Sequence, residues 1–83
     1  MKLAKYVKFR EEKFGGVLFE TRSEKVYTLN PTASAVVREI QAGADEGAIP
    51  GRLKEQFRDE GTAIEREATA FIAQLREKGL VEG

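Results

Sequence analysis

The sequence contains no cysteine, no histidine and no tryptophan among its 83 residues. Without thiols and imidazoles there can be no disulfide, no zinc site built from those ligands, and no catalysis by either group. The only close carboxylate pairs are Glu11–Glu12 and Asp59–Glu60. Adjacent side chains point apart along a strand or a helix, so neither pair converges on one substrate. These absences argue against an enzyme and against a bound metal or cofactor.

Long apolar runs are also absent. No run approaches the roughly 18 residues that span a membrane, and charges interrupt the N-terminal segment every two or three positions. Lys and Arg number 14 and so do Asp and Glu, although residues 1–30 hold seven basic and four acidic side chains. The sequence therefore predicts a soluble cytoplasmic protein without a membrane or nucleic-acid partner, whose N-terminal third is mildly cationic.

Three strand-like segments fill the first third of the chain, at about residues 6–10, 17–21 and 25–29. In the first segment Val7 and Phe9 alternate with polar side chains, as in a strand with one buried face. Gly15 and Gly16 form a flexible pair before the second segment, and the short polar stretch 22–24 suits a hairpin turn before the third. The pattern predicts a three-stranded antiparallel meander with one face packed on the rest of the protein.

Helical patterns fill the remaining two thirds, at about residues 31–42, 48–59 and 63–78. Asn30 is a favoured N-cap, and Pro31 suits the first helical position because its missing N–H costs nothing there. Gly43 is expected to end this helix in a left-handed conformation. The whole chain is therefore predicted to be one α+β domain, in which a three-stranded antiparallel sheet precedes three helices.

The third helix carries start and stop signals of its own. Thr62 and Glu65 have the spacing of a capping box, in which each side chain satisfies a backbone N–H of the other residue. Gly79 followed by Leu80 predicts a helix stop with a hydrophobic clasp.

The third strand and the third helix together suggest a binding surface. Segment 25–29 has no proline and a single charge at one end, so as an outer strand it would be free to pair with an extended peptide. A flank of small and polar residues on the third helix could wall the resulting groove, although the same residues also fit an ordinary solvated helix face. The candidate peptide-binding residues are Val26, Tyr27, Thr28, Leu29, Ala63, Glu67, Ala70, Phe71 and Gln74.

Three stretches, "VYTLNPTASAVVREIQAG", "IPGRLKEQF" and "FIAQLREKGLVE", resemble the PqqD family, the pyrroloquinoline quinone biosynthesis D proteins and their relatives. The likeness runs from about Val17 to Glu82 and is most specific at Leu29–Ala33, where a strand passes directly into a helix. Pro50 and Gly51 depart from the uninterrupted helix formers usual in the family. The stretch Phe14–Gly16 also resembles the related chaperones of the mycofactocin pathway.

The resemblance implies a winged-helix-like fold and a noncatalytic adaptor. Such an adaptor captures the leader of a ribosomally synthesised precursor peptide and presents it to a modifying enzyme, often a radical S-adenosylmethionine (SAM) maturase. Carried onto this chain, the leader would add as a strand beside Val26–Leu29 and lie against the 63–74 region of the third helix. Asn30 and Pro31 would form the family's strand-to-helix junction.

Two alternatives remain open from the sequence. A winged-helix DNA-binding regulator would need a basic third helix, but the chain from Glu46 onward holds six basic and eight acidic residues, which disfavours a duplex. A structural homodimer would use the open strand to pair with its own copy about a twofold axis. Self-pairing and peptide capture would involve the same surface.

Overall fold

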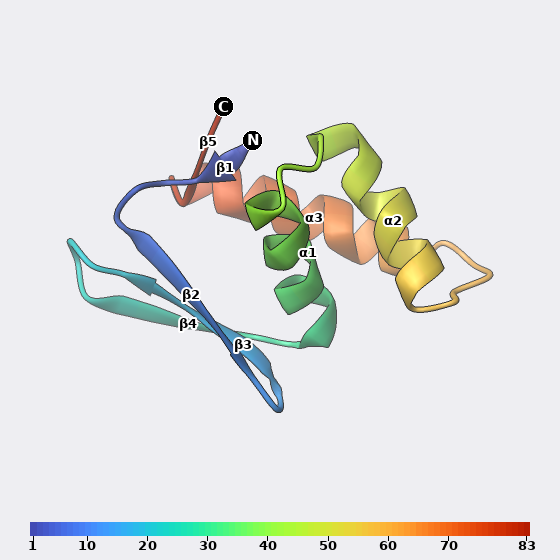
Figure 1. Ribbon diagram of the computed structural model, residues 1–83, viewed down its shortest axis with the longest axis horizontal. Coiled ribbons are helices and arrows are strands. Elements are labelled where there is room, and N and C mark those ends of the chain that lie inside the picture. The colour runs from blue at the N-terminus through green and yellow to red at the C-terminus, as the bar shows by residue number, and fades with distance from the viewer.

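The computed structural model describes residues 1–83 and contains a three-stranded sheet, a group of helices, and a small two-stranded sheet formed near the two chain ends (Figure 1). In chain order the elements are β1 (Lys2–Leu3), β2 (Val7–Glu12), β3 (Gly15–Glu20), β4 (Lys25–Leu29), α1 (Pro31–Gln41), the 3-10 helix η1 (Glu46–Ala48), α2 (Ile49–Gln56), α3 (Ala63–Glu77) and β5 (Val81–Glu82). The predicted α+β class, with an antiparallel sheet followed by three helices, is confirmed.

The main sheet has the strand order β2–β3–β4, with both pairings antiparallel. Side chains alternate across it, so Leu18 and Leu29 are buried against the helices, while Phe19 and Val26 are exposed on the opposite face. Tyr27 is half-buried on the helix side. The sheet therefore has an inner face that contributes to the core and an outer face open to solvent.

Gly15 and Gly16, expected to form a flexible pair before the second strand, are instead the first two residues of β3, and both are buried. A Cβ atom on Gly16 would lie 2.7 Å from the Phe9 ring and 2.9 Å from the Ser34 hydroxyl. The Ser34 hydroxyl donates a 2.8 Å hydrogen bond to the Gly15 carbonyl oxygen. The glycines are needed because α1 lies directly against the backbone of β3.

Helix α1 lies at the centre of the molecule, between the sheet and the other two helices (Figure 1). The Asn30 side-chain oxygen accepts the Ala33 N–H at 2.8 Å, so the predicted N-cap is confirmed. Val36 and Val37 are fully buried. Gly43 follows the helix with a φ of 87°, the left-handed conformation that was expected. The junction fixes the direction of β4 relative to the most buried helix.

Helix α2 is held to α1 by a buried polar contact. Glu39 of α1 is only 8% exposed, and its carboxylate accepts hydrogen bonds from Arg52 and, at 2.7 Å, from the Gln56 amide of α2. Ile49 and Leu53 bury the apolar side of α2. The helix spans eight residues and is preceded by η1, and is thus shorter than the predicted 48–59.

The predicted capping box at the start of α3 is wrong. Thr62 has φ −119° and ψ 3°, which is not the extended backbone of a capping residue, and its side chain makes no capping hydrogen bond. The Asp59 carboxylate instead accepts the N–H groups of Gly61 at 3.3 Å and Ile64 at 3.2 Å. The loop before α3 therefore supplies the cap.

The predicted end of α3 is confirmed. Gly79 has a φ of 70°, its N–H donates to the Arg76 carbonyl, and the N–H of Leu80 donates to the Leu75 carbonyl at 2.9 Å. Leu80 is 2% exposed. This is the Schellman arrangement with its hydrophobic contact. It turns the chain sharply into β5, which pairs with β1 in a short sheet that the sequence did not predict.

Candidate functional site

Strand β4 is an edge strand, and hydrogen bonds elsewhere in the sheet show which of its backbone groups are free. The N–H of Thr21 donates to the Tyr6 carbonyl at 2.9 Å, in the register of the β2–β3 pairing. Backbone groups alternate in direction along a strand, so the odd-numbered residues of β3 face β2. The even-numbered residues Gly16, Leu18 and Glu20 therefore face β4.

The partners of those three residues in β4 are Leu29, Tyr27 and Lys25. By the same alternation, Val26 and Thr28 direct their N–H and C=O groups away from the sheet. Both residues are exposed. The edge thus offers two donors and two acceptors, in the spacing of a strand, to a further chain.

An apolar groove of about 100 Å³ lies between β4 and the C-terminal half of α3. Its volume is far below the roughly 300–1,000 Å³ of small-molecule sites, and suits one side chain of a longer ligand. The lining residues are Leu18, Tyr27, Thr28, Leu29, Phe71, Gln74, Leu75, Lys78 and Leu80. A strand added to β4 would direct every second side chain toward this groove, because side chains on the Tyr27 side of the edge face the helices.

Five of the nine predicted site residues line this groove, namely Tyr27, Thr28, Leu29, Phe71 and Gln74. Val26 contributes backbone groups to the edge, while its side chain lies on the outer face with Lys8, Phe19 and others. As contacts of a peptide, all of these remain predictions.

The other three predicted residues, Ala63, Glu67 and Ala70, do not line the groove. Ala70 lies with Pro50, toward α2. The groove involves α3 only from Phe71 onward, so of the predicted flank only Gln74 reaches it, and a peptide contact at the other three residues remains a prediction.

Four lining residues of the groove are absent from the prediction, namely Leu18, Leu75, Lys78 and Leu80. A signal was available, because Phe71, Gln74 and Lys78 have the spacing i, i+3, i+7 of one helix face.

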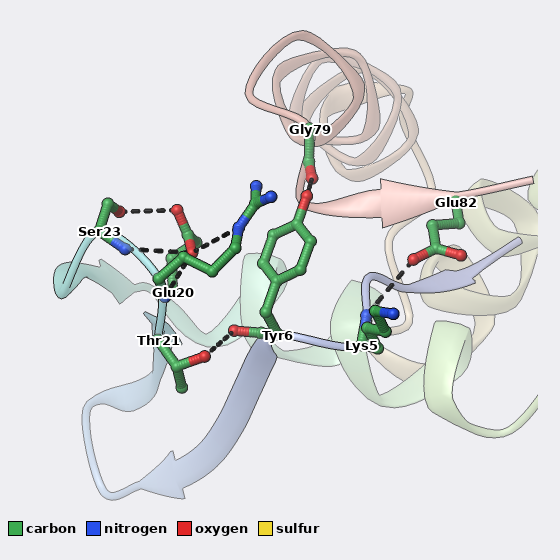
Figure 2. Close-up of polar contacts among 8 residues, drawn as sticks. Lys5, Tyr6, Glu20, Thr21, Ser23, Gly79 and Glu82 are labelled. Atoms are coloured by element: carbon green, nitrogen blue, oxygen red, sulfur yellow. Dashed lines mark hydrogen bonds and ion pairs between the residues drawn. The ribbon is translucent and has the colours of Figure 1, made fainter.

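The end of α3 is held against the sheet at the β3–β4 turn, as Figure 2 shows. The Tyr6 hydroxyl donates to the Gly79 carbonyl at 3.1 Å. The Arg22 guanidinium lies 3.5 Å from the centre of the Tyr6 ring. Lys78, at the end of α3, places its Nζ 5.6 Å from the centre of the Tyr27 ring on β4, within the range of a cation–π contact. We call the region that contains Tyr6, Arg22, Tyr27, Lys78, Gly79 and the start of β4 at Lys25 the basic corner.

The turn itself is organised by Glu20. The Ser23 hydroxyl donates to its carboxylate at 2.6 Å and lowers the pKa of Glu20 below its ordinary value. Desolvation opposes this effect, while the N–H groups of Arg22 and Ser23 and the Arg22 charge add to it. Glu20 is therefore charged at neutral pH and paired with Arg22, whose Nε lies 3.6 Å from the carboxylate.

Other kinds of site find little support. No group of three or more acidic, His or Cys side chains is placed to hold a metal ion. No helix combines the length and apolarity needed to cross a bilayer. Exposed apolar side chains also lie on the outer face of the sheet, where Phe19 is 36% and Val26 60% exposed.

Comparison with known structures finds the same fold in two proteins solved with a leader peptide. TbiB1 in complex with the TbiA(beta) leader peptide has a TM-score of 0.83 and 20% sequence identity, covering 100% of this chain and 96% of TbiB1. Lasso peptide synthetase B1 complexed with the leader peptide has a TM-score of 0.79 and 26% identity, covering 99% and 96%. At 20% identity, the similarity to TbiB1 shows the fold alone.

A comparison with curated proteins found no match. The family model for coenzyme PQQ synthesis protein D (PqqD), however, matches residues 15–81, which include the main sheet from β3 onward, all three helices and the whole groove. The chain therefore belongs to the PqqD family.

Proposed function

We propose that this protein is a noncatalytic adaptor that binds the leader of a ribosomally synthesised precursor peptide and presents the precursor to a modifying enzyme. The observation that carries the proposal is the open edge of β4 beside an apolar groove. Membership of the PqqD family supports it. So do the two structurally similar proteins, both of which were solved with leader peptides.

The leader is proposed to bind as a fourth strand of the main sheet. Val26 and Thr28 offer four backbone groups, and each hydrogen bond contributes about 0.5 to 1.5 kcal/mol net, which sums to about 2 to 6 kcal/mol. Burying one aliphatic side chain in the groove adds about 1.5 to 3 kcal/mol. Together these terms give about 3.5 to 9 kcal/mol before ordering costs, and a micromolar affinity corresponds to about 8.2 kcal/mol, so the edge and one groove contact predict weak binding that is micromolar at the tightest.

Such an affinity is sufficient for an adaptor. A peptide held next to the enzyme reacts at an effective concentration that reaches the millimolar range for short linkages, so tight leader binding is not required. The groove's ionisable side chains are Tyr27 and Lys78, and no carboxylate, thiol or imidazole accompanies them. The chemistry would come from the partner, which we propose is a radical SAM maturase in the cytoplasm.

The main experiment is a selection followed by NMR. A displayed library of random 12-residue peptides is selected against the protein, and the best peptide is titrated into ¹⁵N-labelled protein. We expect the largest amide shifts at Val26, Thr28 and the groove side of α3, and slower hydrogen exchange of the Val26 and Thr28 amides. Failure to select any peptide, or shifts confined to α2 and the outer sheet face, would overturn the proposal.

A second candidate use of the same edge is self-pairing. It is favoured by the same observation, because an uncovered β4 can pair with a second β4 about a twofold axis. Sedimentation at increasing protein concentration would detect such a dimer, and excess selected peptide would dissociate it if both use β4.

The maturase partner has a separate test, since a radical maturase gene beside this one supports it and another kind of modifying enzyme there contradicts it.

A further inference from the structure

Two lysines belong to the basic corner, one on the groove wall and one at the start of β4. Lys78 lines the groove itself and lies over the Tyr27 ring. Lys25 begins β4 two residues before Tyr27, and side chains two residues apart on a strand share a face. Lys78 directly precedes Gly79, whose carbonyl accepts the Tyr6 hydroxyl, and Lys25 directly follows the β3–β4 turn, so both residues belong to this end of the sheet.

Neither lysine has a carboxylate partner in the protein. The cations that form ion pairs are Arg10, Arg22, Arg38, Arg52, Lys54 and Arg76. At the basic corner Glu20 is already engaged by Ser23 and Arg22. Glu24 and Glu77 adjoin the two lysines in sequence, but neither forms an ion pair with them. The corner thus keeps two positive charges without internal neutralisation.

The helix end accounts for only part of this arrangement. A cation in the last turn of a helix is favoured by the helix dipole, which explains a lysine at position 78. It does not explain Lys25, which belongs to the edge strand. The two charges have in common their position beside the path that a strand added to β4 would take.

We infer, on the basis of the proposed function, that the recognised peptides pair an apolar side chain, which fills the groove, with an Asp or Glu two residues away that binds Lys78 and Lys25. Side chains two residues apart on the guest strand share a face and lie about 6.6 to 6.8 Å apart along it. That step leads from the groove beside Leu29 to the basic corner beside Lys25 and Tyr27. The acid follows the apolar residue in an antiparallel guest and precedes it in a parallel one.

The test is a parallel selection of random 12-residue displayed peptides against the wild type and the variant Lys78→Glu. We expect the wild type to enrich Asp or Glu two residues from an apolar position, and Lys78→Glu to enrich Lys or Arg there with the apolar position unchanged. Arg66→Glu is the matched control, because Arg66 is on the same helix but lies toward Pro50, outside the groove. It should select the same peptides as the wild type.

The outcomes separate this inference from the proposed function. If the wild type selects no peptide, the proposed function fails. If it selects peptides with the apolar position but without acidic enrichment, peptide binding stands and the carboxylate inference is overturned. The same conclusion follows if Lys78→Glu and Lys25→Glu still select acids at that position. Thermal melting of each variant establishes that it is folded, so a lost selection cannot be attributed to unfolding.

A double-mutant cycle with synthetic peptides gives the size of the effect. Replacing the acid of a selected peptide with its amide should weaken binding to the wild type about 3- to 10-fold at low salt, as expected for a partly exposed ion pair. The loss should shrink in 0.5 M salt because screening is then stronger. With Lys78→Gln the same peptide change should have less effect, and an undiminished effect would contradict the pairing.

Discussion

Replacing Thr28 with proline tests the edge strand most directly. The Thr28 N–H faces away from β3, so the substitution removes no hydrogen bond of the sheet, and proline is tolerated on the open side of an edge strand. For a bound peptide it removes one donor, worth about 1 kcal/mol, and the ring obstructs the approach of the guest backbone. A total loss of at least about 1.4 kcal/mol predicts at least a tenfold weaker affinity.

The measurement is a fluorescence anisotropy titration with a labelled peptide from the selection described above. Thr28→Val is the matched control, since it keeps the N–H and the branched shape and replaces the exposed hydroxyl with a methyl group, so its affinity should stay within about twofold of the wild type. Melting curves of both variants must show a folded protein. A folded Thr28→Pro variant that binds as tightly as the wild type would refute the reasoning that the guest pairs with the backbone of β4.

Three further predictions concern the scaffold and are measured by urea or thermal unfolding. Gly16→Ala forces a methyl group into the contact between β3 and α1 and should lower the free energy of unfolding by about 1 to 3 kcal/mol. Gly51→Ala has open space within α2 and should raise the free energy of unfolding by about 0.5 to 1 kcal/mol. Equal effects of the two substitutions would contradict the packing described for Gly16. Asp59→Ala should lower the free energy of unfolding by about 0.5 to 2 kcal/mol, and Thr62→Ala should lower it clearly less. The reverse order would indicate that Thr62, and not Asp59, caps α3. Because the pKa of Glu20 is lowered in the folded protein, its charged form stabilises the fold above the unfolded pKa, and this stability is lost as the pH falls through the folded pKa. Glu20→Gln should therefore make the melting temperature less sensitive to acid below about pH 4.5. An unchanged acid dependence would count against this role of Glu20.

Local signals made much of the fold predictable from the sequence. The Asn30 cap and the Gly79–Leu80 stop depend on residues close together in the chain, so their sequence patterns were sufficient. The Thr62 prediction failed although it was equally local, because Asp59 competes for the same helix start. Two-residue strands such as β1 hold too few side chains to show a period.

The candidate site was less predictable because it depends on how distant elements meet. That Val26 and Thr28 face outward follows from register, which required the Tyr6–Thr21 hydrogen bond to establish. Which face of α3 meets β4 depends on the packing of α3 against α1 and α2, and the sequence allowed either flank. Lys78 was not predicted as a site residue for the same reason, since a lysine at a helix end is common and points to a site only when a groove is known to lie beside it.

The small sheet of β1 and β5 also has a consequence for joining this fold to other proteins. Lys2 pairs with Glu82, Gly83 lies against Met1, and both chain ends emerge together (Figure 1). Three residues separate Lys78 from Glu82 and four separate Met1 from Tyr6, so both ends also lie a short distance along the chain from the basic corner. An enzyme fused ahead of this fold and one fused behind it would therefore be tethered at almost the same point. Domain order in a fusion is then expected to matter little, and a circular permutant with new ends in the Gly43–Gly47 loop should still fold.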